Sequence, residues 1–375
     1  MNVLKKRILI LGPTEPSIGG ITTAVNNLMG SNLKNEYDLR LVTNSNHRPM
    51  NKKGVIDLHN IISAIIIIYE LVKEIYFFRP NIVQVETAGE IGFLKQSIYI
   101  LISRLLHCKV IVSLHCANDA EPLTEFYKHS RISRWYCCYV LRRCQMIKLL
   151  SSKWRNSFTN RWGIDSEKII CIQNCLDNEF PWGTALSHSL RLESIMIVSV
   201  GSVGERKGSY LLIEAIRRMS DVGINASLFL VGPEERNGGI LALQEAARLG
   251  GVENRVHLLG GQTREHTLEI LSKADVFALP SYAEGMPYSI IEALAIGCPV
   301  VASDVGAISD IIRNEETGLL IEAGNVEQLY DALCRMAEDG NIRANLSVQG
   351  NKYACKEFSI NKLESLLRSV YEKIH

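Results

Sequence analysis

The chain has 375 residues, more than one hydrophobic core usually serves, since single cores stop growing at about 250 to 300 residues. Its composition, 47% hydrophobic and 22% charged, excludes disordered, collagen-like and fibrous proteins, so two globular domains are expected. The net charge of +1 conceals an asymmetry. Residues 1–180 hold 23 basic and 15 acidic residues (+8), and residues 181–375 hold 18 and 25 (−7). We expect the basic half to meet an anionic surface or ligand, with chance segregation of solvated charge as the alternative.

The cysteine content and the hydropathy narrow the possible classes of protein further. Residues 1–7 lack the apolar core of a secretory signal peptide, so we interpret the ten cysteines as reduced cytosolic thiols. No pair of cysteines is followed by a second pair or by histidines at the spacing of zinc ligands. The most apolar stretch, residues 61–69, is shorter than the roughly 20 residues that cross a bilayer, and it predicts a buried amphipathic helix.

Short apolar runs alternate with helical patterns along the first half. Helical periodicity occupies residues 21–29 and 91–106. Continuous apolar strands are predicted at residues 7–12, 81–85, 109–113, 146–150 and 169–172. Because such strands separated by helices are typical of parallel sheets covered on both faces, the first half is expected to be a doubly wound α/β domain.

The second half repeats this scheme. Helices are predicted to begin near Lys207, Gly239, Arg264, Pro287 and Ile308, and strands at residues 195–200, 226–231, 256–259, 276–279, 299–302 and 319–321. Residues 177–193 contain a proline, a glycine and two serines without periodicity, which is typical of a linker. We therefore expect an α/β fold of two doubly wound Rossmann-like domains. These domains are residues 1–180 and 194–358, joined by a linker at 181–193, with a C-terminal helix at 359–375 packing back on the first domain.

Ligands of open parallel sheets bind at the carboxyl ends of the strands, where helices begin. The first such turn, after the strand at 7–12, holds the adjacent glycines Gly19 and Gly20. It has neither the Gly-x-Gly-x-x-Gly spacing of dinucleotide sites nor the Gly-Lys-Ser/Thr of a P-loop. Two glycines at a helix start let a phosphate or sugar approach the backbone, although a plain tight turn explains them equally well.

The most informative segment follows the strand at 276–279. A loop containing Glu284 leads to Pro287, where a first helical residue is favoured, and Glu292 lies more than one turn inside the helix. At roughly 1.5 Å per residue the two carboxylates cannot converge on one atom, which weighs against a glycosidase-type acid/base pair. The arrangement suits a long ligand, with Glu284 at one end, backbone N–H groups holding a phosphate, and Glu292 on a ribose diol.

These residues carry a family resemblance. Glu284 and Glu292, separated by seven residues, resemble the signature of the retaining glycosyltransferases of family 4, also called glycosyltransferase group 1. Gly201, Lys207 and Gly306 occur in the order that this family shows. The resemblance covers nearly the whole chain. It implies a GT-B fold, in which an acceptor-binding N-terminal domain and a nucleotide-sugar-binding C-terminal domain face a cleft.

The resemblance also implies roles for individual residues. Glu284 would contact hydroxyls of the transferred sugar, Lys207 would neutralise the departing diphosphate, and His115 would lie near the sugar and the acceptor. A fixed cation there lowers the barrier, because the leaving diphosphate gains charge in the transition state. A surface lysine and a structural histidine are the alternatives. The implied donor-binding residues are Gly19, Gly20, Arg206, Gly285, Met286, Pro287 and Glu292.

One position departs from the family pattern. The family usually has an arginine after the glycine that corresponds to Gly201, and this chain has Ser202. One cation of the phosphate clamp is therefore missing from its usual place. Arg206, adjacent to Lys207, substitutes for it if the loop directs its side chain toward the phosphate.

The basic charge of the first half is concentrated between residues 126 and 164, which include no Asp or Glu. Basic and aromatic residues on one helix are typical of a membrane-surface contact, each cation contributing about 1 kcal/mol near anionic lipid. Nucleic acid is the rival partner, but no recognised module accompanies these residues, so we expect none. The expected membrane and acceptor patch comprises Lys128, Arg131, Arg134, Trp135, Arg142 and Arg143.

Together the residues and the resemblance predict a retaining hexosyl- or related glycosyltransferase (EC 2.4). Its expected substrates are a nucleotide-diphosphate sugar and a glycan or lipid-linked acceptor, in bacterial O-antigen, lipopolysaccharide or capsule assembly. No cofactor or metal is expected, because no Asp-x-Asp motif stands at a strand end. The expected location is the cytoplasm, peripheral on the inner face of the membrane. Two alternatives remain, a sugar-nucleotide epimerase of the same fold and a non-catalytic protein that binds the nucleotide sugar.

Overall fold

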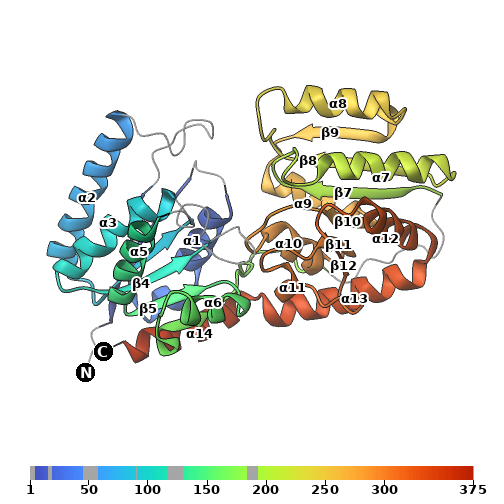
Figure 1. Ribbon diagram of the computed structural model, residues 1–375. Coiled ribbons are helices and arrows are strands. Elements are labelled where there is room, and N and C mark those ends of the chain that lie inside the picture. The colour runs from blue at the N-terminus through green and yellow to red at the C-terminus, as the bar shows by residue number, and fades with distance from the viewer. Residues whose placement is uncertain are drawn as a thin grey trace. The chain divides into compact units, whose positions relative to one another are not determined.

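The computed structural model describes residues 5–15, 19–44, 58–89, 91–115, 130–183 and 193–374. The chain divides into two compact units. The first comprises Met1–Asn178 with Ser359–His375, and the second comprises Glu179–Phe358. Each unit is built on a six-stranded parallel sheet covered by helices (Figure 1). The prediction of two doubly wound α/β domains is confirmed. Most of the expected linker, residues 184–192, lies outside the described residues.

The sheet of the first unit has the strand order β2-β1-β3-β4-β5-β6. Its strands are β1 (Arg7–Gly12), β2 (Asp38–Thr43), β3 (Ile82–Thr87), β4 (Lys109–Leu114), β5 (Met146–Leu149) and β6 (Ile169–Cys171). β1 and β4 are apolar and almost fully buried, as is typical of strands inside a parallel sheet. β2 is absent from the sequence-based prediction because it is an edge strand that alternates polar and apolar residues and lacks a continuous apolar run.

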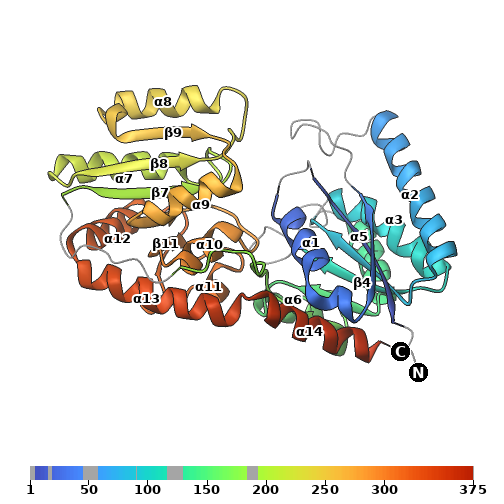
Figure 2. The ribbon, with the colours of Figure 1, turned by 180° about the vertical axis from the view of Figure 1, so that it is seen from behind.

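Helices α2 (Leu58–Phe78), α3 (Ile91–Leu105) and α5 (Arg131–Arg143) lie side by side over the first sheet (Figure 1). A separate apolar cluster joins the sheet to α1 (Gly20–Gly30), η1 (Asn32–Asn35) and α14 (Ile360–Lys373). Figure 2 shows α14, the C-terminal helix, lying along this unit. Its Leu363, Leu367 and Tyr371 are buried in that cluster beside Ile8 and Ile82. The described ranges of this unit also contain the helical segments α6 (Lys153–Asn160) and η3 (Ser166–Lys168).

The apolar stretch 61–69 forms a helix, but the prediction that this helix is buried was wrong. It is the middle of α2, whose buried stripe consists of Ile67, Leu71, Ile75 and Phe78. A helix on the outer layer contacts the protein along one stripe, whereas this helix is apolar around most of its circumference. Its solvent-facing apolar side chains, 38–74% exposed, are Leu58, Ile61, Ile62, Ile65, Ile66, Tyr69, Val72, Tyr76 and Phe77. In the described part of the chain, no helix is long and apolar enough to cross a bilayer.

The sheet of the second unit has the strand order β12-β11-β10-β7-β8-β9. Its strands are β7 (Ile195–Val200), β8 (Ala226–Val231), β9 (Val256–Gly260), β10 (Val276–Leu279), β11 (Val300–Ser303) and β12 (Leu319–Ile321). The helical segments are α7 (Ser209–Asp221), α8 (Gly239–Leu249), η4 (Glu253–Arg255), α9 (Arg264–Lys273), α10 (Tyr288–Ile296), α11 (Ile308–Ile311), α12 (Val326–Glu338) and α13 (Gly340–Glu357). Because β7 and β10 are neighbours in the sheet, the loops after them meet at one edge.

Candidate active site

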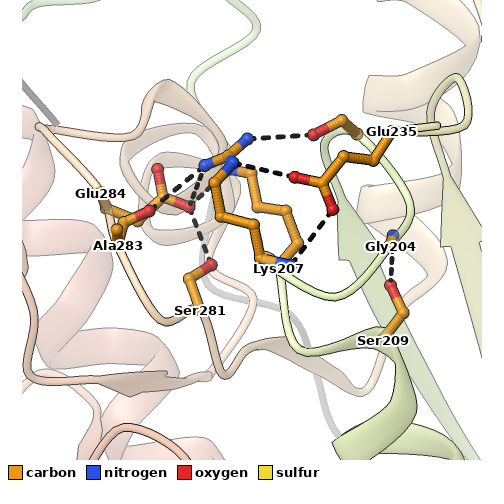
Figure 3. A network of polar contacts seen from close by, with 9 residues as sticks. Gly204, Lys207, Ser209, Glu235, Ser281, Ala283 and Glu284 are labelled. Carbon is orange, nitrogen blue, oxygen red and sulfur yellow. Dashed lines mark hydrogen bonds and ion pairs between the residues drawn. The ribbon is translucent and has the colours of Figure 1, made fainter.

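The loops that follow β7 and β10 bring Lys207 and Glu284 together (Figure 3). The Nζ of Lys207 lies 2.5 Å from Oε1 of Glu284, and the hydroxyl of Ser281 donates to the same oxygen at 2.8 Å. The side chains of Lys207 and Glu284 are 13% and 8% exposed, so the pair is largely shielded from water. Two of the residues singled out from the sequence, 77 positions apart, therefore form one buried ion pair.

Two glycines leave the room that this pair needs. Gly201 has φ +147°, and a Cβ there would lie 2.9 Å from Cε of Lys207, whose side chain passes over it. Gly306 has φ +61°, and a Cβ there would lie 1.8 Å from the carbonyl oxygen of Glu284. Any larger residue at either position would displace the lysine side chain or the loop that carries the carboxylate.

Arg206 belongs to the same network, which settles the direction of its loop. Its Nη2 donates to the hydroxyl of Ser202 at 3.0 Å, and its Nη1 donates to the carbonyl of Ala283 at 3.2 Å. Nη1 also lies 4.0 Å from Oε1 of Glu284, while Nε donates to Oε1 of Glu235 at 3.2 Å. The serine that replaces the usual arginine thus contacts the guanidinium of Arg206, which is directed toward Glu284.

The segment Gly285-Met286-Pro287 leads into α10. The helix begins at Tyr288 and Pro287 is its N-cap, so the prediction of Pro287 as the first helical residue is wrong by one position. The reason is that Pro287 has extended backbone angles, φ −71° and ψ 124°. The carbonyl of Gly285 accepts a hydrogen bond from the Ala307 N–H at 2.8 Å, and Met286 is buried. The positive end of the α10 dipole therefore lies beside the loop that carries Glu284.

Glu292 lies inside α10 and is 9% exposed. Its Oε1 is 3.7 Å from Nε of Arg264, the first residue of α9. Glu284 and Glu292 thus have different basic partners. Arg264 did not emerge from the sequence, because its only signal was its position at the predicted start of a helix.

In the first unit, Gly19 and Gly20 stand where α1 begins. Gly19 is the N-cap residue, and its carbonyl accepts a hydrogen bond from the Thr23 N–H at 3.1 Å. Both glycines are exposed, and residues 16–18 before them lie outside the described residues. The start of α1 thus presents backbone to solvent at the carboxyl end of β1.

His115 directly follows β4 and pairs with a residue that the sequence analysis did not single out. Its Nε2 lies 2.6 Å from Oε2 of Glu86 on the neighbouring strand β3, and the two side chains are 5% and 2% exposed. Burial by itself would raise the pKa of Glu86, but the charge of Lys148, the hydrogen bond and charge of a protonated His115, and the hydrogen bond from Gln84 lower it to about 2. The available signal was the alternation of Gln84 and Glu86 with apolar residues in β3.

The patch predicted on the first unit maps to α5, and Lys128 lies outside the described residues. Trp135 is 64% exposed, and the arginines Arg131, Arg134, Arg142 and Arg143 are exposed as well. Arg134 and Arg142 donate to the carbonyls of Arg161 and Trp162, and the Arg143 guanidinium lies over the Tyr139 ring. Within the described ranges, none of the four arginines of α5 forms an ion pair with a carboxylate.

This chain resembles known proteins both in sequence and in fold. Residues 194–339 match the model of the family described as "Glycosyl transferases group 1". A capsular polysaccharide biosynthesis glycosyltransferase of Staphylococcus aureus is 25% identical over 260 residues, 69% of this chain and 63% of that protein. A lipopolysaccharide core biosynthesis glycosyltransferase of Rhizobium meliloti is 32% identical over 165 residues, 44% of this chain and 46% of that protein. The crystal structure of Anabaena HepE in complex with UDP-glucose is 17% identical with a TM-score of 0.73, covering 98% of this chain and 99% of that one.

The two doubly wound units and the family match define the class, a glycosyltransferase with the GT-B fold. Within this class, residues 194–339 match the model of the group 1 family. The fold and the glycosyltransferase class expected from the sequence are confirmed.

Proposed function

We propose that this chain transfers a sugar from a nucleotide-diphosphate sugar, with retention of configuration and without a metal ion. The observation that carries the proposal is the buried pair of Lys207 and Glu284, 2.5 Å apart beside the start of α10. Retention is proposed because the spacing of Glu284 and Glu292 resembles that of the retaining transferases of family 4.

The residues around this pair supply what departure of a diphosphate requires. Negative charge develops on the phosphate oxygen as its bond to the anomeric carbon breaks, and preorganised positive groups stabilise that charge. The second unit provides such groups in Lys207, Arg206 and the N-terminal end of α10. Because these groups supply the positive field, we propose that no metal ion or other cofactor takes part. Glu284 would accept hydrogen bonds from hydroxyls of the transferred sugar once a ligand separates it from Lys207.

The nucleotide would lie along α10. The carboxylate of Glu292 is held by Arg264 and suits a ribose diol, and the backbone N–H groups of Gly285 and Met286 suit the diphosphate. Uridine diphosphate hexoses are the first donors to test, because the Anabaena structure of the same fold is a complex with UDP-glucose.

The acceptor is proposed to be a glycan or lipid-linked saccharide of a bacterial surface polysaccharide, presented at the inner face of the cytoplasmic membrane. The relatives named for capsular polysaccharide and lipopolysaccharide core biosynthesis support this class. A membrane-facing surface on the first unit supports it as well. We define this surface as the exposed apolar side of α2 together with Trp135 and the arginines of α5. Exposed apolar side chains on α2, and cations on α5 that have no carboxylate partner in the described ranges, fit an anionic lipid surface better than a second copy of the chain.

The experiment that tests the proposal measures turnover of a panel of UDP-sugars by the purified full chain, with and without polyprenyl-linked saccharide acceptors. We expect release of the nucleoside diphosphate together with transfer or hydrolysis of the sugar. Glu284→Ala and Lys207→Ala should each lower the rate about 100-fold or more, as loss of one preorganised electrostatic contact does in other enzymes. Glu316→Ala and Lys273→Ala, which make the same changes at surface ion pairs, should leave the rate unchanged.

Two results would contradict the proposal. Conversion of the nucleotide sugar into an isomer without release of diphosphate would identify an epimerase. Thermal stabilisation by a nucleotide sugar without any turnover would identify a protein that binds the donor but does not transfer the sugar.

A further inference from the structure

A row of buried hydrogen bonds runs through the first unit from α14 to His115. The Tyr371 hydroxyl on α14 donates to Oε1 of Gln84 at 2.6 Å, and Nε2 of Gln84 donates to Oε1 of Glu86 at 2.6 Å. The other oxygen of Glu86 lies 2.6 Å from Nε2 of His115. Gln84 and Tyr371 are 0% exposed, and Glu86 is 2% exposed. This row connects the C-terminal helix with the residue at the carboxyl end of β4.

The direction of each hydrogen bond in the row follows from its neighbour. The hydroxyl of Tyr371 donates to the amide oxygen of Gln84, so the Gln84 NH₂ group is turned toward Glu86. Glu86 is ionised, since its pKa is lowered to about 2, and an ionised carboxylate only accepts hydrogen bonds. Nε2 of His115 must therefore carry the proton that is donated to Glu86.

The same direction determines what the other imidazole nitrogen can do. When the imidazole is neutral, the proton on Nε2 leaves a lone pair on Nδ1, so Nδ1 is an acceptor; in the imidazolium both nitrogens donate. Nδ1 makes no hydrogen bond with a residue in the described ranges. It stands where ligands of parallel sheets bind, directly after a strand.

We propose that Glu86 is the positioning residue for His115. It fixes the imidazole with Nε2 protonated, so that Nδ1 accepts a hydrogen bond from a sugar hydroxyl at the carboxyl end of β4. Lys148 on β5 balances the charge of Glu86, and Gln84 and Tyr371 hold the carboxylate in one orientation. This inference rests on the proposed transferase function, since it assigns the sugar hydroxyl to the same reaction.

The first test is Glu86→Gln, which keeps the shape of the side chain and removes its charge. We expect kcat to fall about 10- to 100-fold, the usual loss when the partner of a functional histidine is removed, with KM for the donor unchanged. Nitrogen-15 NMR of the imidazole should show Nε2–H in the wild type and a mixture of tautomers in Glu86→Gln, with the His115 signals assigned by their loss in His115→Ala. Glu364→Gln is the matched control. It removes a buried carboxylate of the same unit that accepts from the Asn32 N–H at 2.7 Å, and it should leave kcat and the tautomer unchanged.

A double-mutant cycle separates positioning from a structural role. In a His115→Ala background, Glu86→Gln should lower kcat no further, because the residue through which it acts is gone. A further loss there, or an unchanged tautomer in Glu86→Gln, would overturn the proposal. Should Glu86→Gln not fold, Tyr371→Phe tests the same row of hydrogen bonds by removing only a hydroxyl. A mixture of His115 tautomers in the wild-type protein would overturn the proposal as well. A wild type that shows the Nε2–H tautomer but no transfer of any sugar would refute the proposed function and leave the positioning intact.

Discussion

At the scale of single residues, buried charge is balanced locally in this protein. Glu86 is desolvated but keeps its charge, because Lys148, His115 and Gln84 outweigh the cost of burial. Glu284 is buried against Lys207 and Ser281 in the same way. Such pairs contribute little net stability compared with apolar residues, since desolvation offsets their attraction. Their value in this chain is that they hold charged groups at the carboxyl ends of the strands.

The lowered pKa of Glu86 predicts how stability depends on pH. Its folded-state pKa, about 2, lies below the ordinary value of 4.5, so the ionised form favours the folded state. This contribution is complete above pH 4.5 and is lost as the pH falls toward 2. Urea unfolding measured at several pH values should show a steeper loss of stability in this window for the wild type than for Glu86→Gln. Equal pH dependence in the two proteins would show that the pKa of Glu86 does not differ between the folded and unfolded states.

At the scale of elements, two helices of the first unit, α2 and α14, differ in how much of their apolar surface is covered. α14 is far along the chain from the sheet that it covers, yet one side of it is buried in the core of that sheet. α2 comes from the middle of the first half, and its second apolar side faces solvent. A sequence pattern predicts that a helix forms and which of its sides are apolar. It does not predict how many of those sides other parts of the protein cover.

The burial of α14 predicts that the first unit depends on it. Leu367→Ala should lower the free energy of unfolding by about 2 to 5 kcal/mol, because it leaves a cavity at a position that is 1% exposed. Thermal or urea unfolding measures this loss. Ser365→Ala, on the exposed side of the same helix, is the control and should change stability by less than about 0.5 kcal/mol. A similar small effect for both variants would show that α14 contributes little to the core.

At the scale of the whole molecule, charge and function divide along the chain. The acidic second half contains the match to the group 1 family, and its Arg206 and Lys207 lie in the loop after β7. The basic first half carries the surface that we propose to face the membrane, with its apolar residues on α2 and its cations on α5. A nearly neutral chain therefore combines two regions suited to different partners.

Vesicle flotation tests the membrane-facing surface. We expect the full chain to bind vesicles rich in phosphatidylglycerol and not vesicles of phosphatidylcholine. Arg142→Glu/Arg143→Glu should weaken binding roughly 30-fold, because each cation contributes about 1 kcal/mol near anionic lipid. Ile65→Gln/Ile66→Gln, on the exposed side of α2, should weaken it about tenfold or more through lost apolar contact.

Lys352→Glu/Lys356→Glu, which makes the same charge change on α13, is the control and should bind as the wild type does. Brominated lipids should quench the fluorescence of the exposed Trp135, since Trp154 and Trp162 are buried and the half-buried Trp182 belongs to the second unit. Binding that does not depend on anionic lipid would contradict the proposal. The proposal would also be contradicted if the α2 variants altered the sedimentation of the protein but not its binding to vesicles. That result would identify the surface as a contact between two copies of the chain.

Much of the fold follows from local pattern. Continuous apolar strands such as β1 and β4, separated by helices, define a parallel sheet because only such a sheet buries both faces of each strand. The edge strand β2 and the exposed side of α2 could not be predicted in this way. Their environment depends on which neighbours are absent, and the sequence does not record that.

The candidate active site likewise has residues that the sequence predicts and contacts that only the folded structure shows. The sequence by itself determined the candidate Glu284, because a strand end, a Gly/Pro loop and a helix start are local features with recognisable residues. The family resemblance in the same sequence added Lys207 and His115. Only the tertiary structure decided that Arg206 is directed toward Glu284 and that Glu86 pairs with His115. Those contacts join neighbouring strands that are distant in sequence, and strand order and register determine which side chains meet.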